Sequence, residues 1–141
     1  MDETLKGRWG YRSFRNNYTL TNGQVKGELA LPWAPPGVLE VDTDSAGTVT
    51  GTLTFTLPDP KNPGQTVKRS LKITGRVIPS AGPIPTSVEL VGEGLNAIYN
   101  IKGFFIPRSG HVVGTVLNRA NDLAQRPVGT VGPFVLIPNE P

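Results

Sequence analysis

The residues that most often carry out chemistry are few in this chain and lie far apart. There is a single histidine, His111, and no cysteine, so a transition-metal site is not expected. His111 follows the turn-forming residues 107–110, and no carboxylate stands beside it to orient it as a general base. Glu89 and Glu93 flank a predicted turn rather than forming an acid–base pair. The sequence therefore identifies no catalytic residue and predicts neither a metal nor a cofactor.

Aromatic and polar residues that share strand faces could instead bind a small molecule. If Trp9 points into a folded sheet, Tyr11 and Ser13 point the same way, because side chains alternate along a strand. A buried tyrosine hydroxyl needs a hydrogen-bond partner, which can be protein, water or ligand. The same alternation on later segments completes the set of expected ligand-binding residues: Trp9, Tyr11, Ser13, Arg69, Tyr99, Phe105 and Asn118.

Two of these residues have an alternative role. Trp9 can pack as a plug at one end of a barrel core, or it can stack on a ligand. Arg69 interrupts the apolar face of its segment, and burying an arginine without a partner is costly. We therefore expect Arg69 either near the rim of the fold or inside it, paired with an acidic ligand or with Glu40.

The segments that carry these residues alternate as β-strands do. Residues 47–57 alternate apolar residues and glycine with threonine, and residues 65–78 repeat the pattern with a polar, largely basic outer face. The proline- and glycine-rich residues 58–64 between them predict an antiparallel hairpin. The predicted strands cover residues 7–14, 24–31, 37–42, 47–57, 65–78, 86–91, 97–106, 111–119 and 130–137, and one short helical turn is predicted over 118–125.

Glycine recurs inside these predicted strands, although it weakens a strand. Such a glycine is typical of a barrel corner or of a close approach between two backbones. Gly27, Gly51 and Gly75 fall on the inward face of their strands, and the others are Gly10, Gly103, Gly114 and Gly132. The predicted fold class is all-β: a single antiparallel up-and-down β-barrel of about eight strands, formed by residues 1–141 as one domain with consecutive strands side by side. A β-sandwich is the alternative.

Several short motifs resemble those of the calycin barrels, a group that includes lipocalins, fatty-acid-binding proteins and avidins. Gly7-Arg8-Trp9 resembles the Gly-x-Trp motif that opens the first calycin strand. Two stretches resemble the avidins in particular: Gly47-Thr48-Val49-Thr50-Gly51-Thr52, and Ile73-Thr74-Gly75-Arg76 followed by Ser80. Val113-Gly114-Thr115 is a weaker likeness. The resemblance implies a calycin-like barrel with a ligand site in its lumen.

The ligand of the avidins is not implied. Avidins bind biotin with several tryptophans on their later strands, whereas the only tryptophans here are Trp9 and Trp33. The avidin position that hydrogen-bonds the ligand shortly after Gly-x-Trp is occupied by Tyr11-Arg12-Ser13. Lipocalins commonly have a disulfide and a late helix, and this chain has no cysteine and no room for a long helix.

Composition and charge limit the partners. The 141 residues carry a net charge of +3, with no strong basic stripe of the kind that binds nucleic acid. No stretch is apolar enough for a membrane helix, and the first residues lack a signal-peptide pattern, so we expect no membrane and a cytoplasmic location. The three C-terminal strands are apolar on both faces, which predicts a homo-oligomer formed through them.

The sequence therefore predicts a small-molecule-binding β-barrel. Its ligand would be apolar or amphipathic, held in a mainly apolar lumen and oriented by tyrosine and asparagine groups. Two alternatives remain open from the sequence. One is a barrel enzyme, such as a cyclase or isomerase acting on a polyketide- or terpenoid-like substrate with a tyrosine proton donor. The other is a structural module that assembles into homo-oligomers and has a packed lumen.

Overall fold

The computed structural model describes residues 4–122 and 127–138, with side chains other than those of residues 16–20, 25 and 27–30. The described residues form nine β-strands: β1 (Gly7–Thr21), β2 (Gln24–Pro32), β3 (Gly37–Thr43), β4 (Thr48–Pro58), β5 (Thr66–Ile78), β6 (Ser87–Gly94), β7 (Ala97–Phe105), β8 (Val112–Ala120) and β9 (Val131–Pro138). Each predicted strand is present. The largest difference is that β1 continues from residue 14, where we expected its end, to Thr21.

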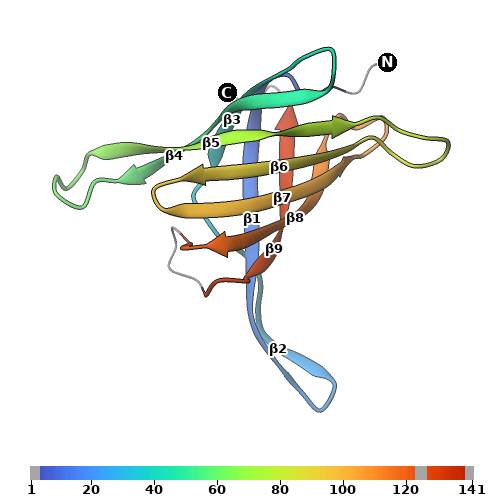
Figure 1. The fold of residues 1–141 in the computed structure, drawn as a ribbon. Coiled ribbons are helices and arrows are strands. Elements are labelled where there is room, and N and C mark those ends of the chain that lie inside the picture. The colour runs from blue at the N-terminus through green and yellow to red at the C-terminus, as the bar shows by residue number, and fades with distance from the viewer. Residues whose placement is uncertain (1–3, 123–126, 139–141) are drawn as a thin grey trace.

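Eight of these strands form one closed antiparallel barrel (Figure 1). The order around the ring is β1, β3, β4, β5, β6, β7, β8 and β9, and β9 pairs back onto β1. That last pairing runs from Trp9 opposite Pro138 to Ser13 opposite Phe134. The predicted all-β, up-and-down barrel of about eight strands is confirmed, with one further strand outside the ring.

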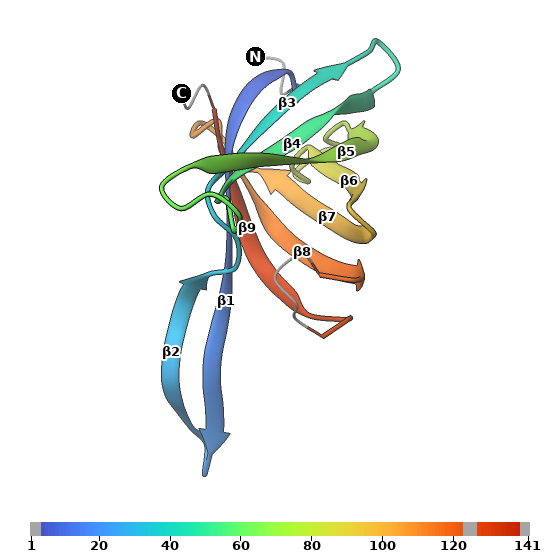
Figure 2. The same cartoon turned by 90° about the vertical axis from the view of Figure 1, so that its left-hand side faces the viewer.

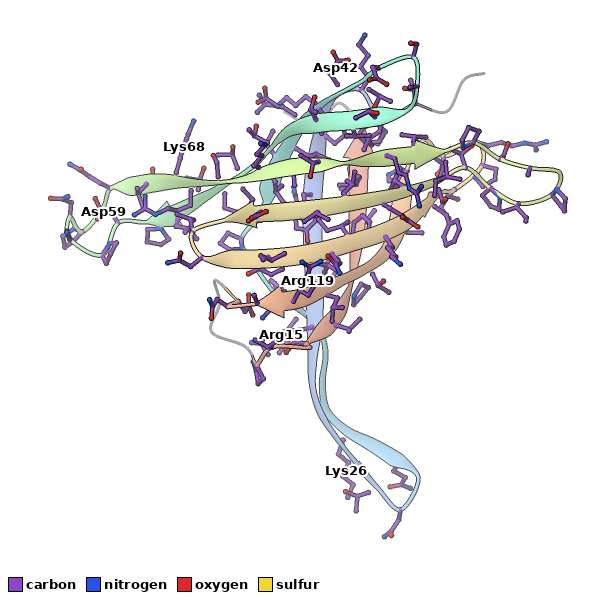
Figure 3. All side chains as sticks on the ribbon, in the orientation of Figure 1. Arg15, Lys26, Asp42, Asp59, Lys68 and Arg119 are labelled. Carbon is purple, nitrogen blue, oxygen red and sulfur yellow. The ribbon has the colours of Figure 1, made fainter. Side chains whose placement is uncertain are left out.

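The extra strand is β2, and its position corrects the prediction that consecutive strands lie side by side throughout. Beyond Ser13, β1 leaves the ring and pairs only with β2. Residues 15–31 thus form a two-stranded arm that extends away from the barrel (Figure 2), with Lys26 far out along it (Figure 3). Gly27 lies on this arm and not on a strand of the ring, so its predicted place on the inward face is wrong.

Local turn chemistry explains the arm. Asn22 and Gly23 both have positive φ, at 51° and 77°, as required in the tight turns that join two-stranded hairpins. This turn pairs β2 with the nearest strand in sequence, at a distance from the ring. The chain returns through Trp33, whose backbone N–H donates to the Ser13 carbonyl at 3.0 Å, and β3 then takes the place beside β1.

The predicted helical turn over residues 118–125 is also wrong where the structure describes it. Residues 118–120 belong to β8. Asn118 lies opposite Tyr99 of β7, and its backbone N–H donates to the Thr130 carbonyl at 2.9 Å. Sheet pairing on both sides therefore outweighs the local helical preference. Residues 123–126 lie outside the described residues.

One end of the barrel is closed by its own side chains. Leu5, just before β1, is fully buried. The Thr43 hydroxyl at the end of β3 donates a hydrogen bond to the Leu5 carbonyl. Trp9 is 6% exposed, donates from Nε1 to the Lys6 carbonyl at 3.2 Å, and meets Phe105 edge-on with ring centroids 6.4 Å apart. This is the plug position that we expected as one of the two roles of Trp9.

Glycines mark the places where neighbouring strands cross closely. A Cβ atom at Gly51 of β4 would collide with the Glu40 carbonyl of β3, and one at Gly75 of β5 would collide with the Glu89 carbonyl of β6. Both glycines lie on the inward side of their strands. The glycine pattern therefore indicates the tight coiling of the strands that lets the sheet close into a ring.

The outer surface of the last three strands carries exposed apolar side chains. Phe104 is 49% exposed and Val131 is 57% exposed, while Val113 and Val135 are half-buried. Phe104, Val113 and Val135 lie opposite one another on β7, β8 and β9. A homo-oligomer formed through this surface stays a prediction.

Replacing residues 16–30 with an Asn-Gly dipeptide should leave the barrel folded. Arg15 and Leu31 are already paired, so a two-residue turn can join them, and no pairing of the ring is removed. We expect an unchanged far-UV circular dichroism spectrum and a Tm within about 5 °C of the parent. Loss of cooperative thermal unfolding would show instead that the arm belongs to the folding unit.

Gly51→Ala should lower the free energy of unfolding by about 1–3 kcal/mol or more, because the added Cβ meets backbone that cannot yield easily. Thr52→Ala, one residue along on the exposed face, is the matched control and should cost less than about 1 kcal/mol. Urea denaturation of both variants measures the difference. Equal effects would mean that the strands do not cross tightly at Gly51.

Candidate functional site

The barrel half away from Trp9 holds a cavity of about 140 Å³. Five strands of the ring contribute to its wall, and two non-strand segments contribute at its open end. The lining residues are Tyr11 and Ser13 of β1; Leu53, Phe55 and Leu57 of β4; Arg69 and Leu71 of β5; Tyr99 and Ile101 of β7; Val116 of β8; Trp33, Ala34 and Pro35 between β2 and β3; and Asp122 after β8. The wall is therefore mainly aliphatic and aromatic, with a few polar groups.

Tyr11 is a buried polar residue of the cavity wall, with an exposed fraction of 4%. Its ring stacks on Phe134 with centroids 6.0 Å apart and meets Phe55 edge-on at 5.9 Å. Burial raises the pKa of Tyr11 to about 12, a hydrogen bond with Ser13 acts in the opposite direction, and the negative charge of Asp122 adds to the rise. The Tyr11 hydroxyl is thus neutral at physiological pH and is available as a hydrogen-bonding group.

Asp122 joins the two non-strand segments to the wall of the cavity. The indole Nε1 of Trp33 donates to one carboxylate oxygen at 3.0 Å, and the Tyr99 hydroxyl donates to the other at 2.6 Å. The rings of Trp33 and Tyr99 also meet edge-on, with centroids 6.5 Å apart. Because Asp122 is only 9% exposed, these hydrogen bonds are made in a poorly hydrated setting and hold the cavity mouth in one shape.

Sequence reasoning missed both Trp33 and Asp122 as site residues. Asp122 fell within the segment predicted as a helical turn, so its position over the lumen was not foreseen. A signal was present for Trp33, because a buried indole N–H needs an acceptor and few carboxylates are available near the expected barrel mouth. The two residues are 89 positions apart, and only closure of the ring brings them together.

The structure brings four of the seven predicted ligand-binding residues to the cavity: Tyr11, Ser13, Arg69 and Tyr99. Trp9 and Phe105 do not line it, because they pack together at the closed end. Asn118 does not line it either. Its side chain is fully buried, and neither atom of its carboxamide has a hydrogen-bond partner among the described residues.

Arg69 lies at the open end of the cavity and is exposed. It occupies an inward position of β5, opposite Phe55 and two residues before the buried Leu71. This is the position near the rim that we gave as the first of two alternatives. The alternative pairing with Glu40 is wrong, because Glu40 is on the outer surface, where Arg8 lies 3.7 Å from it. Pairing positions on a barrel alternate between inside and outside, and Glu40 falls on the outside.

The remaining groups considered for chemistry lie elsewhere. The His111 ring hydrogen-bonds the Ser109 carbonyl in the β7–β8 turn, and Glu89 pairs with Arg76 at 3.1 Å on the outer surface. Residues 4–122 and 127–138 contain no cluster of three or more histidine, cysteine or acidic residues that could hold a metal ion. Within the same ranges, no helix is long and apolar enough to cross a membrane.

Comparison with known proteins does not place this chain in a family. No protein-family model, curated protein or solved structure matches it.

The raised pKa of Tyr11 predicts a specific loss of stability at alkaline pH. Tyrosine in the unfolded chain ionises near pH 10 and Tyr11 in the folded barrel near pH 12. Folding thus favours the neutral form of Tyr11. Its contribution to the free energy of unfolding is complete below pH 10 and is lost as the pH rises towards 12. Between pH 9 and 11 the loss is about 1 kcal/mol.

Urea denaturation of the parent and of Tyr11→Phe at pH 9, 10 and 11 tests this. The parent should lose about 1 kcal/mol more than the variant over this range, because the variant cannot ionise at position 11. Parallel pH profiles for the two proteins would show that Tyr11 is not shielded from water.

Proposed function

We propose that this protein binds a small, mainly apolar molecule in the open half of its barrel. The observation that carries the proposal is the cavity of about 140 Å³ beside a closed end at which Leu5, Trp9 and Phe105 are buried. The same barrel fills one half of its lumen with its own side chains and leaves the other half hollow. A structural module without a ligand would be expected to pack both halves.

The size of the cavity indicates the size of the ligand. An apolar cavity of roughly 150 Å³ accommodates one benzene-sized ring. The walls offer aromatic faces from Phe55 and Tyr99 and aliphatic groups from Leu53, Ile101 and Val116. Burial of apolar surface would drive binding at about 25 cal/mol per Å², and the polar lining groups would orient the bound molecule.

The polar groups favour binding over catalysis. A tyrosine proton donor was the basis of the enzyme alternative, yet burial raises the pKa of Tyr11 to about 12. A general acid works best when its pKa lies near the working pH, so Tyr11 suits a neutral hydrogen bond better than a proton transfer. The avidin-like motifs support a lumen ligand in general terms, and the cavity walls, with Trp33 as their single tryptophan, do not favour biotin.

Benzyl alcohol is a suitable first probe because it is one ring with one neutral hydrogen-bonding group. Isothermal titration calorimetry should detect a single site with a Kd on the order of 0.1–1 mM, the range expected for burying one ring. Val116→Phe, which fills the cavity from β8, should weaken binding at least about tenfold.

Val113→Phe is the matched control. It adds the same atoms to the same strand at a half-exposed position that does not line the cavity, and it should bind the probe as the parent does. Thermal unfolding of both variants checks that each is folded. Equal binding by the parent and by Val116→Phe would place the probe outside the cavity, and no binding to the folded parent by any single-ring probe would refute the proposal.

A further inference from the structure

The most informative unassigned group at the cavity is the Arg69 guanidinium. It is the one basic side chain among the described residues that line the cavity. Within the described part of the chain, its Nη1 donates a hydrogen bond to the neighbouring Lys68 carbonyl at 3.3 Å. The other charged lining group, Asp122, comes from the segment after β8, and β6 and β7 separate it from β5 in the ring.

Two carboxylates that could be considered as partners of Arg69 are engaged elsewhere. Glu40 pairs with Arg8 on the outer surface. Asp59, in the turn of the β4–β5 hairpin (Figure 3), accepts hydrogen bonds from the Asn62 side chain and the Lys61 backbone N–H, both at 2.9 Å. Those hydrogen bonds lower the pKa of Asp59 most, and the charge of Arg69 contributes least. Arg69 is therefore not held in an ion pair by the described part of the chain.

Arg69 is placed so that its positive charge lies at the cavity mouth, beside any molecule bound in the cavity. Ile73, Leu71 and Arg69 share the inward side of β5. Ile73 and Leu71 are buried, and Arg69 lies beyond them towards the cavity mouth, where it is exposed. Phe55 and Leu57 lie beside it on β4. A single ring that fills the apolar interior would present its substituent to this mouth. An arginine offers two parallel N–H donors that match a carboxylate.

We propose that the ligand is a compact ring compound bearing a carboxylate, with the ring in the apolar cavity and the carboxylate at Arg69. This inference rests on the proposed lumen-binding function and adds the charge of the ligand and its orientation. The ring enters first because the interior is apolar, and the acid stays at the exposed mouth, where it keeps part of its hydration.

The test compares acids with neutral compounds of the same shape. Benzoate, phenylacetate and 3-phenylpropionate are each titrated into the 141-residue protein by calorimetry at pH 7 and low salt, beside the corresponding alcohols. At least one acid should bind about fivefold tighter than its alcohol, the gain expected for a partly exposed charge-assisted pair. The difference should shrink as salt is added.

Arg69→Gln should abolish the preference for the acid over the alcohol, with the larger loss of affinity in the acid. Arg76→Gln is the matched control, because Arg76 is on the same strand and carries the same charge, but it pairs with Glu89 outside the barrel. It should keep the preference. Thermal unfolding of both variants confirms that they are folded.

Each other outcome has a definite meaning. If alcohols bind and acids bind no better, the inference about Arg69 is overturned while lumen binding stands. If phenethylamine binds tighter than phenylacetate, the charge preference belongs to Asp122 and the inference is also overturned. If Arg69→Gln weakens acids and alcohols equally, Arg69 shapes the cavity rather than pairing with the ligand. If no compound binds the parent, both the inference and the proposed function fail.

Discussion

The closure of β9 onto β1 is the constraint on which the rest of the structure depends. Five residue pairs, from Trp9–Pro138 to Ser13–Phe134, convert an open sheet into a ring. Because inward side chains alternate along β1, this short contact sets three depths in the lumen. Trp9 lies in the plug at the closed end, Tyr11 lies above it in the cavity wall, and Ser13 lies farther along the same wall. Beyond Ser13 the strand leaves the ring and becomes one side of the arm.

Closure of so small a ring demands that neighbouring strands cross closely, and the inward glycines meet that demand. At Gly51 and Gly75 the carbonyl of the adjacent strand occupies the space that a side chain would need. Each of these glycines weakens its strand locally. The compensation is the core inside, where Leu39, Leu53 and Ile73 are almost completely buried. The same coiling narrows the lumen until its closed half is filled by side chains.

The two ends of the barrel are stabilised by different interactions. The closed end is held mainly by packing around Leu5 and Trp9, and the Trp9 indole and the Thr43 hydroxyl donate there to backbone carbonyls. The open end is held by hydrogen bonds from Trp33 and Tyr99 to Asp122. Directional bonds fix the distance between segments without filling the space between them. A cavity can therefore persist beside Asp122, whereas close packing would have removed it. Arg69 at the mouth adds a positive charge to a wall that is mainly apolar.

The sequence alone determined the strands, their antiparallel connections and the closed barrel. Alternation of apolar and polar residues is a local property of the sequence, as in Thr48–Pro58. The glycines at positions 51 and 75 lie where the backbones of neighbouring strands cross closely, so they indicate from the sequence that the sheet closes into a ring. It also named four residues that line the cavity, because side-chain alternation along a strand predicts which residues share a face. These residues are Tyr11, Ser13, Arg69 and Tyr99.

Only the tertiary structure decided the depth of each residue in the lumen and the partners at the mouth. Alternation does not distinguish Trp9 at the closed end from Tyr11 in the cavity wall, since both face inward. The position of β2 outside the ring depends on which strand β1 pairs with after Ser13. The hydrogen bond between Trp33 and Asp122 joins residues 89 positions apart. The contact between Trp33 and Asp122 arises from how the ring closes, and no local pattern in the chain encodes it. The Asn22-Gly23 turn favours a hairpin of β1 with β2, but it does not determine where β1 leaves the ring.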